Sequence, residues 1–120
     1  MQYMLLIYRA ESAEPLPETP EFGTLMQGYM DFTQEIEKNG VMVEGNALEQ
    51  VVTSTTVKVR NGKTETIDGP FAETKEQFGG YYILDCKDLD EAIGYAAKIP
   101  SAVHGSIEIR PVKVFEMLEG

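Results

Sequence analysis

The chain has 120 residues, 20 of them acidic and 10 basic, so it is expected to form one domain, residues 1–120, with a net charge of −10. A chain of this length buries a sizeable core without disulfides or metals, and its negative field disfavours direct binding to nucleic-acid phosphates. The single cysteine, Cys86, excludes an intrachain disulfide and a thiolate metal cluster within one chain.

The first strand is predicted at residues 3–8, an unbroken apolar run that is typical of a strand covered on both faces. This run is far shorter than the ~20 apolar residues of a membrane span. The residues around it lack the basic leader and the small-residue cleavage site of a secretory signal. We therefore expect a cytoplasmic protein that does not associate with membranes.

A proline-rich loop over residues 9–20 leads into the first predicted helix. Residues 19–21, Thr-Pro-Glu, supply a capping hydroxyl, a proline for the first turn and an acid near the helix N-terminus. The pair at residues 39–40, Asn-Gly, is a helix stop. One apolar stripe runs along this helix at three- and four-residue spacing. Its members are Phe22, Leu25, Met26, Tyr29, Phe32 and Ile36.

A β region follows this helix. Residues 41–43 and 47–48 predict short, irregular strands, whereas residues 52–60 predict a better one with alternating valines. The dipeptide at residues 61–62, Asn-Gly, is a strong hairpin signal. Residues 64–67 are then the partner strand of this hairpin.

The C-terminal part predicts a strand, a helix and a last strand. Residues 80–86 form a second unbroken apolar run. Residues 88–91, Asp-x-x-Glu, are a variant of the capping box and open a helix that ends by Pro100. The last strand, residues 106–115, changes its apolar phase at Pro111, where we expect an edge, a bulge or a strand break. The helix carries its apolar face on Leu89, Ala92, Ile93 and Ala96.

This order of elements predicts an α+β fold of the ferredoxin-like β-α-β-β-α-β type with an added β-hairpin. Right-handed connections place both helices on one face of an antiparallel sheet. Residues 3–8 and 80–86 are nevertheless apolar on both faces, and no further element remains to cover the second face. We therefore expect a homodimer with sheet against sheet, a dimeric α+β barrel that buries more than ~1,000 Å². The alternative is an apolar face that binds a different partner.

Three segments resemble a known family. They are IDGPFAETKEQFGGYYILDC at residues 67–86, DLDEAIGYAAKIPSA at residues 88–102 and GSIEIRPV at residues 105–112. Together they resemble the YCII-related family, and more narrowly its DGPF-domain branch, named for residues 68–71. The resemblance extends over residues 3–112. It implies a dimeric ferredoxin-like α+β barrel of mostly unassigned function. Some DGPF genes lie beside extracytoplasmic-function sigma factors, which implies a sigma-factor regulatory partner.

The sequence departs from the wider family at two positions. Family members are similar in having a histidine near the first helix and an aspartate just before a proline at the end of the second helix, proposed as an acid–base pair. Here no histidine lies within residues 18–36, and Ile99 precedes Pro100. The pair cannot be carried over, and the main reason to expect an enzyme is lost with it.

The loop around residues 68–77 holds four candidate site residues. Asp68 either hydrogen-bonds its own turn or acts as an acceptor or general base at the mouth of the barrel. Phe71 is either a packing anchor or a ring that stacks on a substrate. Glu73 and Lys75 belong either to a solvated charged loop or to a polar cluster that gates a pocket.

Two further candidates lie near the last strand. His104 titrates near neutral pH without help, so it is either an exposed loop residue or an acid–base group. Arg110 either holds an anionic ligand or pairs with Glu73. No metal-binding spacing and no nucleotide-binding motif is present, so we expect neither a metal nor a cofactor. Cys86 has no basic neighbour and is expected to be buried and inert.

Two functional hypotheses follow. The first is a homodimer that acts as an accessory or regulatory module or as a small-molecule-binding module. The second is a small-molecule enzyme that uses acid–base chemistry in a polar pocket near the DGPF loop. This pocket would lie between helix-free sheet faces. Its lining would come from Asp68, Glu73, Lys75, His104 and Arg110.

Overall fold

The computed structural model describes residues 1–115. The main elements are β1 (Gln2–Arg9), α1 (Pro20–Lys38), β2 (Met42–Ala47), β3 (Thr55–Arg60), β4 (Lys63–Asp68), β5 (Gln77–Asp85), α2 (Leu89–Ala96) and β6 (Ser106–Pro111). Three short 3-10 turns, η1 (Glu11–Ala13), η2 (Val51–Thr53) and η3 (Pro100–Val103), lie between them. The α+β fold and its two helices are as predicted.

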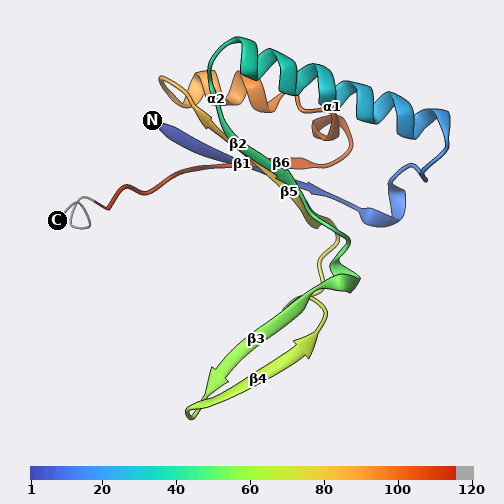
Figure 1. Cartoon of the computed structure of the whole chain (residues 1–120), viewed down its shortest axis with the longest axis vertical. Helices are drawn as coiled ribbons and strands as arrows, with labels where there is room; N and C mark the ends of the chain where they lie inside the picture. The colour runs from blue at the N-terminus through green and yellow to red at the C-terminus, as the bar shows by residue number, and fades with distance from the viewer. Residues whose placement is uncertain (116–120) are drawn as a thin grey trace.

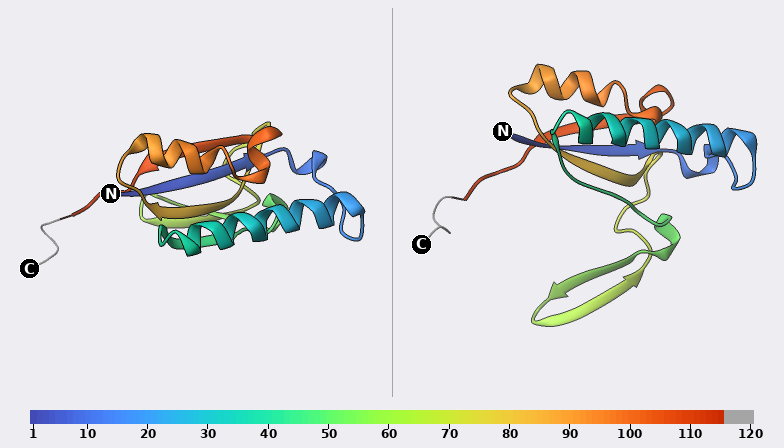
Figure 2. Two further views of the ribbon diagram at one scale, coloured as in Figure 1. Left: turned by 90° about the horizontal axis from the view of Figure 1, so that it is seen from above. Right: turned by 45° about the horizontal axis from the view of Figure 1, so that its top comes forward.

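The strands form a four-stranded antiparallel sheet in the order β2-β5-β1-β6 and a separate two-stranded sheet of β3 and β4. Figure 1 shows both helices on one side of the larger sheet, as expected. Figure 2 shows α1 and α2 side by side over the strands. Neither helix within residues 1–115 is long and apolar enough to cross a lipid bilayer.

The helix boundaries follow from local capping chemistry. The Thr19 hydroxyl accepts a hydrogen bond from the Phe22 backbone N–H at 3.2 Å and caps α1. Gly40 adopts a left-handed φ of 71° just after the end of this helix. The Asp88 carboxylate accepts a hydrogen bond from the Glu91 N–H at 2.9 Å and caps α2. Both predicted helix starts are confirmed.

The core lies between the helices and the larger sheet. Alternate residues of the central strands point toward the helices, and Leu5, Leu84 and Ile36 are 0% exposed. Burial of each such side chain stabilises the fold by about 1.5–3 kcal/mol. Cys86 is buried as predicted, and burial, followed by the nearby Glu91 carboxylate, raises the pKa of its thiol.

The opposite face of this sheet, called the open face here, carries the other half of the alternation. Its centre consists of Met4, Leu6 and Tyr8 on β1 with Tyr81 and Ile83 on β5, which are cross-strand neighbours. No helix or strand within residues 1–115 covers this face. The structure therefore shows the uncovered apolar surface from which a homodimer was predicted, while the dimer itself stays a prediction.

The hairpin of β3 and β4, called the arm here, projects away from the larger sheet on the side opposite the helices (Figure 1). Its turn uses Asn61 and Gly62 with φ values of 52° and 75°, as the Asn-Gly signal predicts. The strand predicted at residues 52–60 is shorter than expected. Residues 51–53 instead form η2, in which the Thr53 N–H donates to the Gln50 carbonyl at 3.0 Å, and the Val51 N–H donates to the Glu11 carboxylate at 3.0 Å.

Two other predictions need correction. The last strand ends at Pro111 and does not continue to residue 115, because proline has no N–H for the ladder. This strand lies at the sheet edge, one of the expected outcomes. On α2, Leu89 and Ile93 are 49% and 48% exposed. The helix instead packs through its alanines, whose small side chains permit a close approach to the sheet.

Candidate functional site

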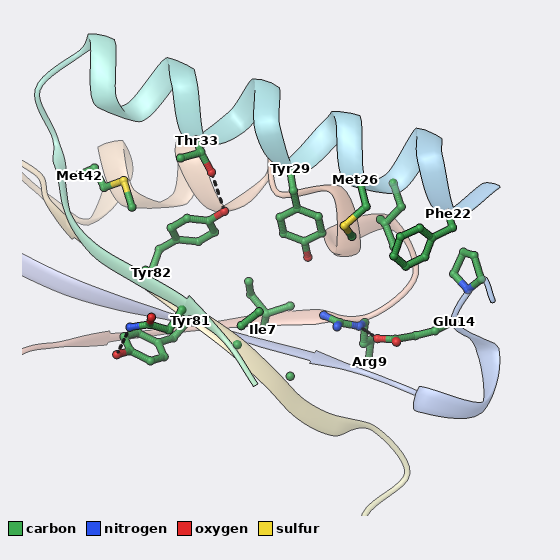
Figure 3. A pocket seen from close by; sticks show the side chains of 17 residues that line it. Ile7, Arg9, Glu14, Phe22, Met26, Tyr29, Thr33, Met42, Tyr81 and Tyr82 are labelled. Atoms are coloured by element: carbon green, nitrogen blue, oxygen red, sulfur yellow. Dashed lines mark hydrogen bonds and ion pairs between the residues drawn. The ribbon is translucent and has the colours of Figure 1, made fainter. Parts of the chain in front are cut away.

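A cavity of about 360 Å³ lies between α1 and the larger sheet, on the helix-covered side (Figure 3). Met26 is 38% exposed at its edge, so the cavity reaches the surface along this side of α1. The walls are largely apolar. They include Ile7, Pro15, Phe22, Leu25, Met26 and Met42.

The cavity exists because the sheet is lined by small residues beneath the first half of α1. Gly45, Ala47, Gly79 and Gly80 form this part of the lining. A Cβ added at Gly45 would lie 2.7 Å from the Tyr82 ring, and one added at Gly80 would lie 2.9 Å from the Asn46 carbonyl oxygen on β2. Glycine at residue 80 thus lets β5 lie close to the backbone of β2. Beneath the second half of the helix, large side chains fill the core.

Three hydroxyl groups enter the cavity. The Tyr82 and Thr33 hydroxyls are 3.0 Å apart, and the Tyr29 hydroxyl lies 2.6 Å from that of the buried Ser101 on η3. Burial raises the pKa of Tyr82, and the bond to Thr33 opposes this shift only in part. The phenol is therefore neutral near physiological pH. Each hydroxyl can donate or accept, so the cavity offers polar contacts without a fixed charge on these groups.

One ion pair lies at the end of the cavity. Arg9 follows Leu5 and Ile7 in the inward-facing alternation of β1, and its Nε pairs with the Glu14 carboxylate. Arg9 and Glu14 are 23% and 26% exposed. Arg9 was not predicted as a site residue, because the apolar run that predicts the first strand ends at residue 8. Extending the two-residue period by one step would have found it.

The candidates of the DGPF loop lie elsewhere. Asp68, Phe71, Glu73 and Lys75 are all exposed, and none of them lines the cavity. Asp68 ends β4 and pairs with Thr55 inside the arm.

Two interactions expected in this loop differ from the prediction. Backbone and hydroxyl groups hold the turn after β4, since Gly69 N–H donates to the Ser54 carbonyl at 2.7 Å and the Thr56 hydroxyl donates to the Gly69 carbonyl at 2.8 Å. Among residues 1–115 no hydrogen bond uses the Asp68 carboxylate. Phe71 is 83% exposed, so it is not a packing anchor within one chain.

The two remaining candidates lie at opposite ends of β6. His104 follows η3, two residues before the strand, and is exposed. Arg110 pairs across the sheet with Met4 on the open face, while Ser106 pairs with Tyr8. Within the described chain no ion pair joins Arg110 to Glu73. One chain therefore does not bring Asp68, His104 and Arg110 together, and their functional roles stay predictions.

Across residues 1–115 no group of three or more histidine, cysteine, aspartate or glutamate side chains converges in a way that could hold a metal ion. The chemistry that the cavity offers is therefore apolar contact, hydroxyl hydrogen bonding and one arginine with its carboxylate partner.

Comparisons with known proteins place this fold among relatives. An uncharacterised protein of Rhizobium meliloti strain 1021 is 32% identical over 118 residues, which is 97% of this chain and 95% of that protein. The solved structure of a 5-chloro-2-hydroxyhydroquinone dehydrochlorinase from Burkholderia phenoliruptrix AC1100, in complex with 2,5-dihydroxybenzoquinone, matches 98% of each chain with a TM-score of 0.51 and 12% identity. At that identity the likeness shows the fold alone. Residues 1–116 match the YCII-related domain, and the chain therefore belongs to the YCII-related family.

Proposed function

We propose that the protein is a small-molecule-binding module whose ligand occupies the cavity between α1 and the larger sheet. One observation carries this proposal: apolar walls surround the convergent hydroxyls of Tyr29, Thr33 and Tyr82. Small-molecule sites combine such walls with a few polar groups. A flat, mostly apolar ligand fits the space between the helix and the glycine-lined strands.

A second copy of the chain is the proposed cover of the open face. No further helix or strand within residues 1–115 covers the apolar side chains on this face and on the arm. Val57 and Val59 of the arm are each 59% exposed, and Phe71 is 83% exposed. Exposed apolar surface of this extent supports an interface, and a symmetric homodimer would cover both surfaces at once.

The accessory or regulatory role rests on the resemblance of residues 68–71 and their flanks to the DGPF branch. A sigma factor would then be the regulatory partner, in the cytoplasm. The enzyme remains the alternative, with Asp68 or His104 as the acid–base group. In its support, a protein of the same fold is a dehydrochlorinase seen with a quinone ligand. Against it, neither residue lines the cavity of one chain.

Calorimetric titration with naphthalene-2-carboxamide, a flat neutral probe, tests the binding proposal. Met26 and Met30 both lie exposed on α1, but only Met26 lines the cavity. We expect the wild type and Met30→Trp to bind the probe alike, and Met26→Trp to bind about tenfold more weakly. No saturable binding, or equal binding by both tryptophan variants, contradicts the proposal.

Turnover separates the module from the enzyme. Chloride release from 5-chloro-2-hydroxyhydroquinone, the substrate class of the protein with the same fold, is measured with the wild type, Asp68→Asn and His104→Ala. The module predicts no release above the protein-free rate. Release that either substitution abolishes establishes the enzyme instead.

A further inference from the structure

We infer that the natural ligand of the cavity is a flat organic anion whose carboxylate pairs with Arg9. This inference rests on the proposed function, because it names the ligand class of the same cavity. Arg9 is the charged continuation of a buried apolar stripe, so its side chain enters a largely apolar space.

The guanidinium of Arg9 has N–H donors on Nη1 and Nη2 that a ligand could use. Its Nε is occupied by Glu14. Within residues 1–115 no hydrogen bond is donated by Nη1 or Nη2 of Arg9, and neither atom is a buried group without a partner. Figure 3 shows the guanidinium extending from the Glu14 side into the cavity, beneath Tyr29. The terminal nitrogens therefore face the space that a ligand would fill.

Gly79 creates room for this arrangement. It is the extra residue of a β-bulge, because Ile7 pairs with Gly80 while Tyr8 pairs with Phe78. A Cβ added at Gly79 would lie 3.0 Å from Nη1 and 3.2 Å from Nη2 of Arg9. The guanidinium thus lies against bare backbone. Glycine at the bulge lets the planar group lie across the strand with its outer edge directed into the cavity.

The chemistry of this group selects the ligand. A guanidinium presents parallel N–H donors in a planar fork that matches a carboxylate, and such charge-assisted bonds are about twice as strong as neutral ones. The surrounding apolar residues lower the local dielectric and strengthen the pairing. Ile7, Phe22, Met26 and Tyr29 then contact the flat apolar body of the same ligand.

Because the net charge is −10, the protein as a whole does not attract an anion, and only contacts within the cavity can favour one. Long-range repulsion of an anion is screened beyond about 10 Å at 0.1 M salt. Glu14 offsets part of the charge of Arg9 when the cavity is empty. Binding of an anion must therefore come from the direct contact with Nη1 and Nη2, and it is expected to strengthen when the competing carboxylate of Glu14 is removed.

The test compares naphthalene-2-carboxylate with its neutral isostere, naphthalene-2-carboxamide, by calorimetry on the full chain. We expect the acid to bind the wild type about tenfold more tightly than the amide. Arg9→Gln removes this preference because it weakens acid binding more than amide binding. Glu14→Gln strengthens acid binding only. Arg60→Gln, which alters an exposed arginine on the arm that does not line the cavity, serves as the matched control and changes neither affinity.

The outcomes separate this inference from the proposed function. If both probes bind the wild type equally, or the amide binds better, the ligand class is wrong although the cavity binds. If neither probe binds, both proposals fail. A preference for the acid that persists in Arg9→Gln also overturns the role of Arg9. Should Arg9→Gln not fold, Arg9→Lys, which keeps the charge but loses the planar fork, is expected to reduce the preference.

Discussion

The two faces of the four-stranded sheet differ in burial, although neighbouring residues of the same strand form them. Leu5 is 0% exposed beneath the helices, whereas Leu6, the next residue, lies half-buried on the open face. Both are leucines at the centre of β1, so residue type does not explain the difference. What differs is the layer available to cover each side. A strand that is apolar on both sides thus predicts that both faces of the sheet are buried. The two helices of one chain can bury only one of these faces.

The covered face is itself divided. Phe32 and Ile36 of α1 pack on large strand residues, whereas Phe22 and Met26 of the same stripe border the cavity. α1 carries large apolar side chains in both halves, but the strand residues beneath the two halves differ in size. Glycine and alanine at the ends of β2 and β5 therefore separate the packed core from the cavity.

The largest expected effect tests the packed part of the covered face. Leu5→Ala is expected to lower the free energy of unfolding by about 2–5 kcal/mol, because it removes buried methyl groups and leaves a cavity. Urea denaturation followed by circular dichroism measures this change. Leu16→Ala is the matched control, since Leu16 is 72% exposed and its truncation should change stability by less than about 0.5 kcal/mol. Equal costs at both positions would contradict the assignment of the core.

The next effect concerns the open face. Leu6→Glu places a carboxylate at the centre of the proposed symmetric interface, where the two copies bring like charges together. We expect sedimentation analysis to give twice 13.4 kDa for the wild type and a single 13.4 kDa chain for the variant, with the same helix content. Gln34→Glu adds the same charge on the exposed side of α1 and should stay dimeric. A wild type that is monomeric at micromolar concentration refutes the dimer.

Local signals in the sequence predicted most of the body of the fold. The hydroxyl at Thr19, the carboxylate at Asp88 and the Asn-Gly turn each act within four residues, so the sequence alone contains their chemistry. The place of the arm does not follow from such signals. No pattern within residues 55–68 predicts that β3 and β4 form a separate two-stranded sheet apart from the larger one.

The candidate site was predicted less well because its residues come from segments that are distant in sequence. Asp68 and its charged neighbours are close in sequence, but a loop that leaves a projecting hairpin does not converge on a cavity. Arg9 and Gly79 are far apart in sequence and meet through the register of β1 and β5. Strand register across many residues cannot be deduced from a single sequence, and the bulge at Gly79 shifts it once more.

A moderate effect is expected at the border of core and cavity. Tyr82→Phe removes the hydrogen bond to Thr33 and should lower the free energy of unfolding by about 0.5–1.5 kcal/mol at neutral pH. Thr33→Val should have a similar cost, and the double variant should cost less than the sum. Additive costs in urea titrations would show that the two hydroxyls do not interact.

The same tyrosine gives a pH signature. Burial raises its pKa above 10.0 in the folded chain, so the unfolded chain loses this proton first as the pH rises. The contribution of Tyr82 to stability is therefore fully present below pH 10.0 and is lost as the pH rises through the folded-state pKa. The decline of unfolding free energy above this pH should be shallower in Tyr82→Phe. An identical decline in wild type and variant would contradict the raised pKa.

The smallest effect asks whether the arm belongs to the same interface as the open face. Phe71 packs against little within its own chain, being 83% exposed, and so its truncation should leave the unfolding of a single chain unchanged. If a second copy covers the arm as well as the open face, Phe71→Ala should raise the dimer dissociation constant about threefold, or ~0.6 kcal/mol. Leu16→Ala, at another exposed site outside both surfaces, should leave it unaltered. A dissociation constant that Phe71→Ala does not change would restrict the interface to the open face, because an aromatic ring that lies inside an interface cannot be removed without loss of apolar contact.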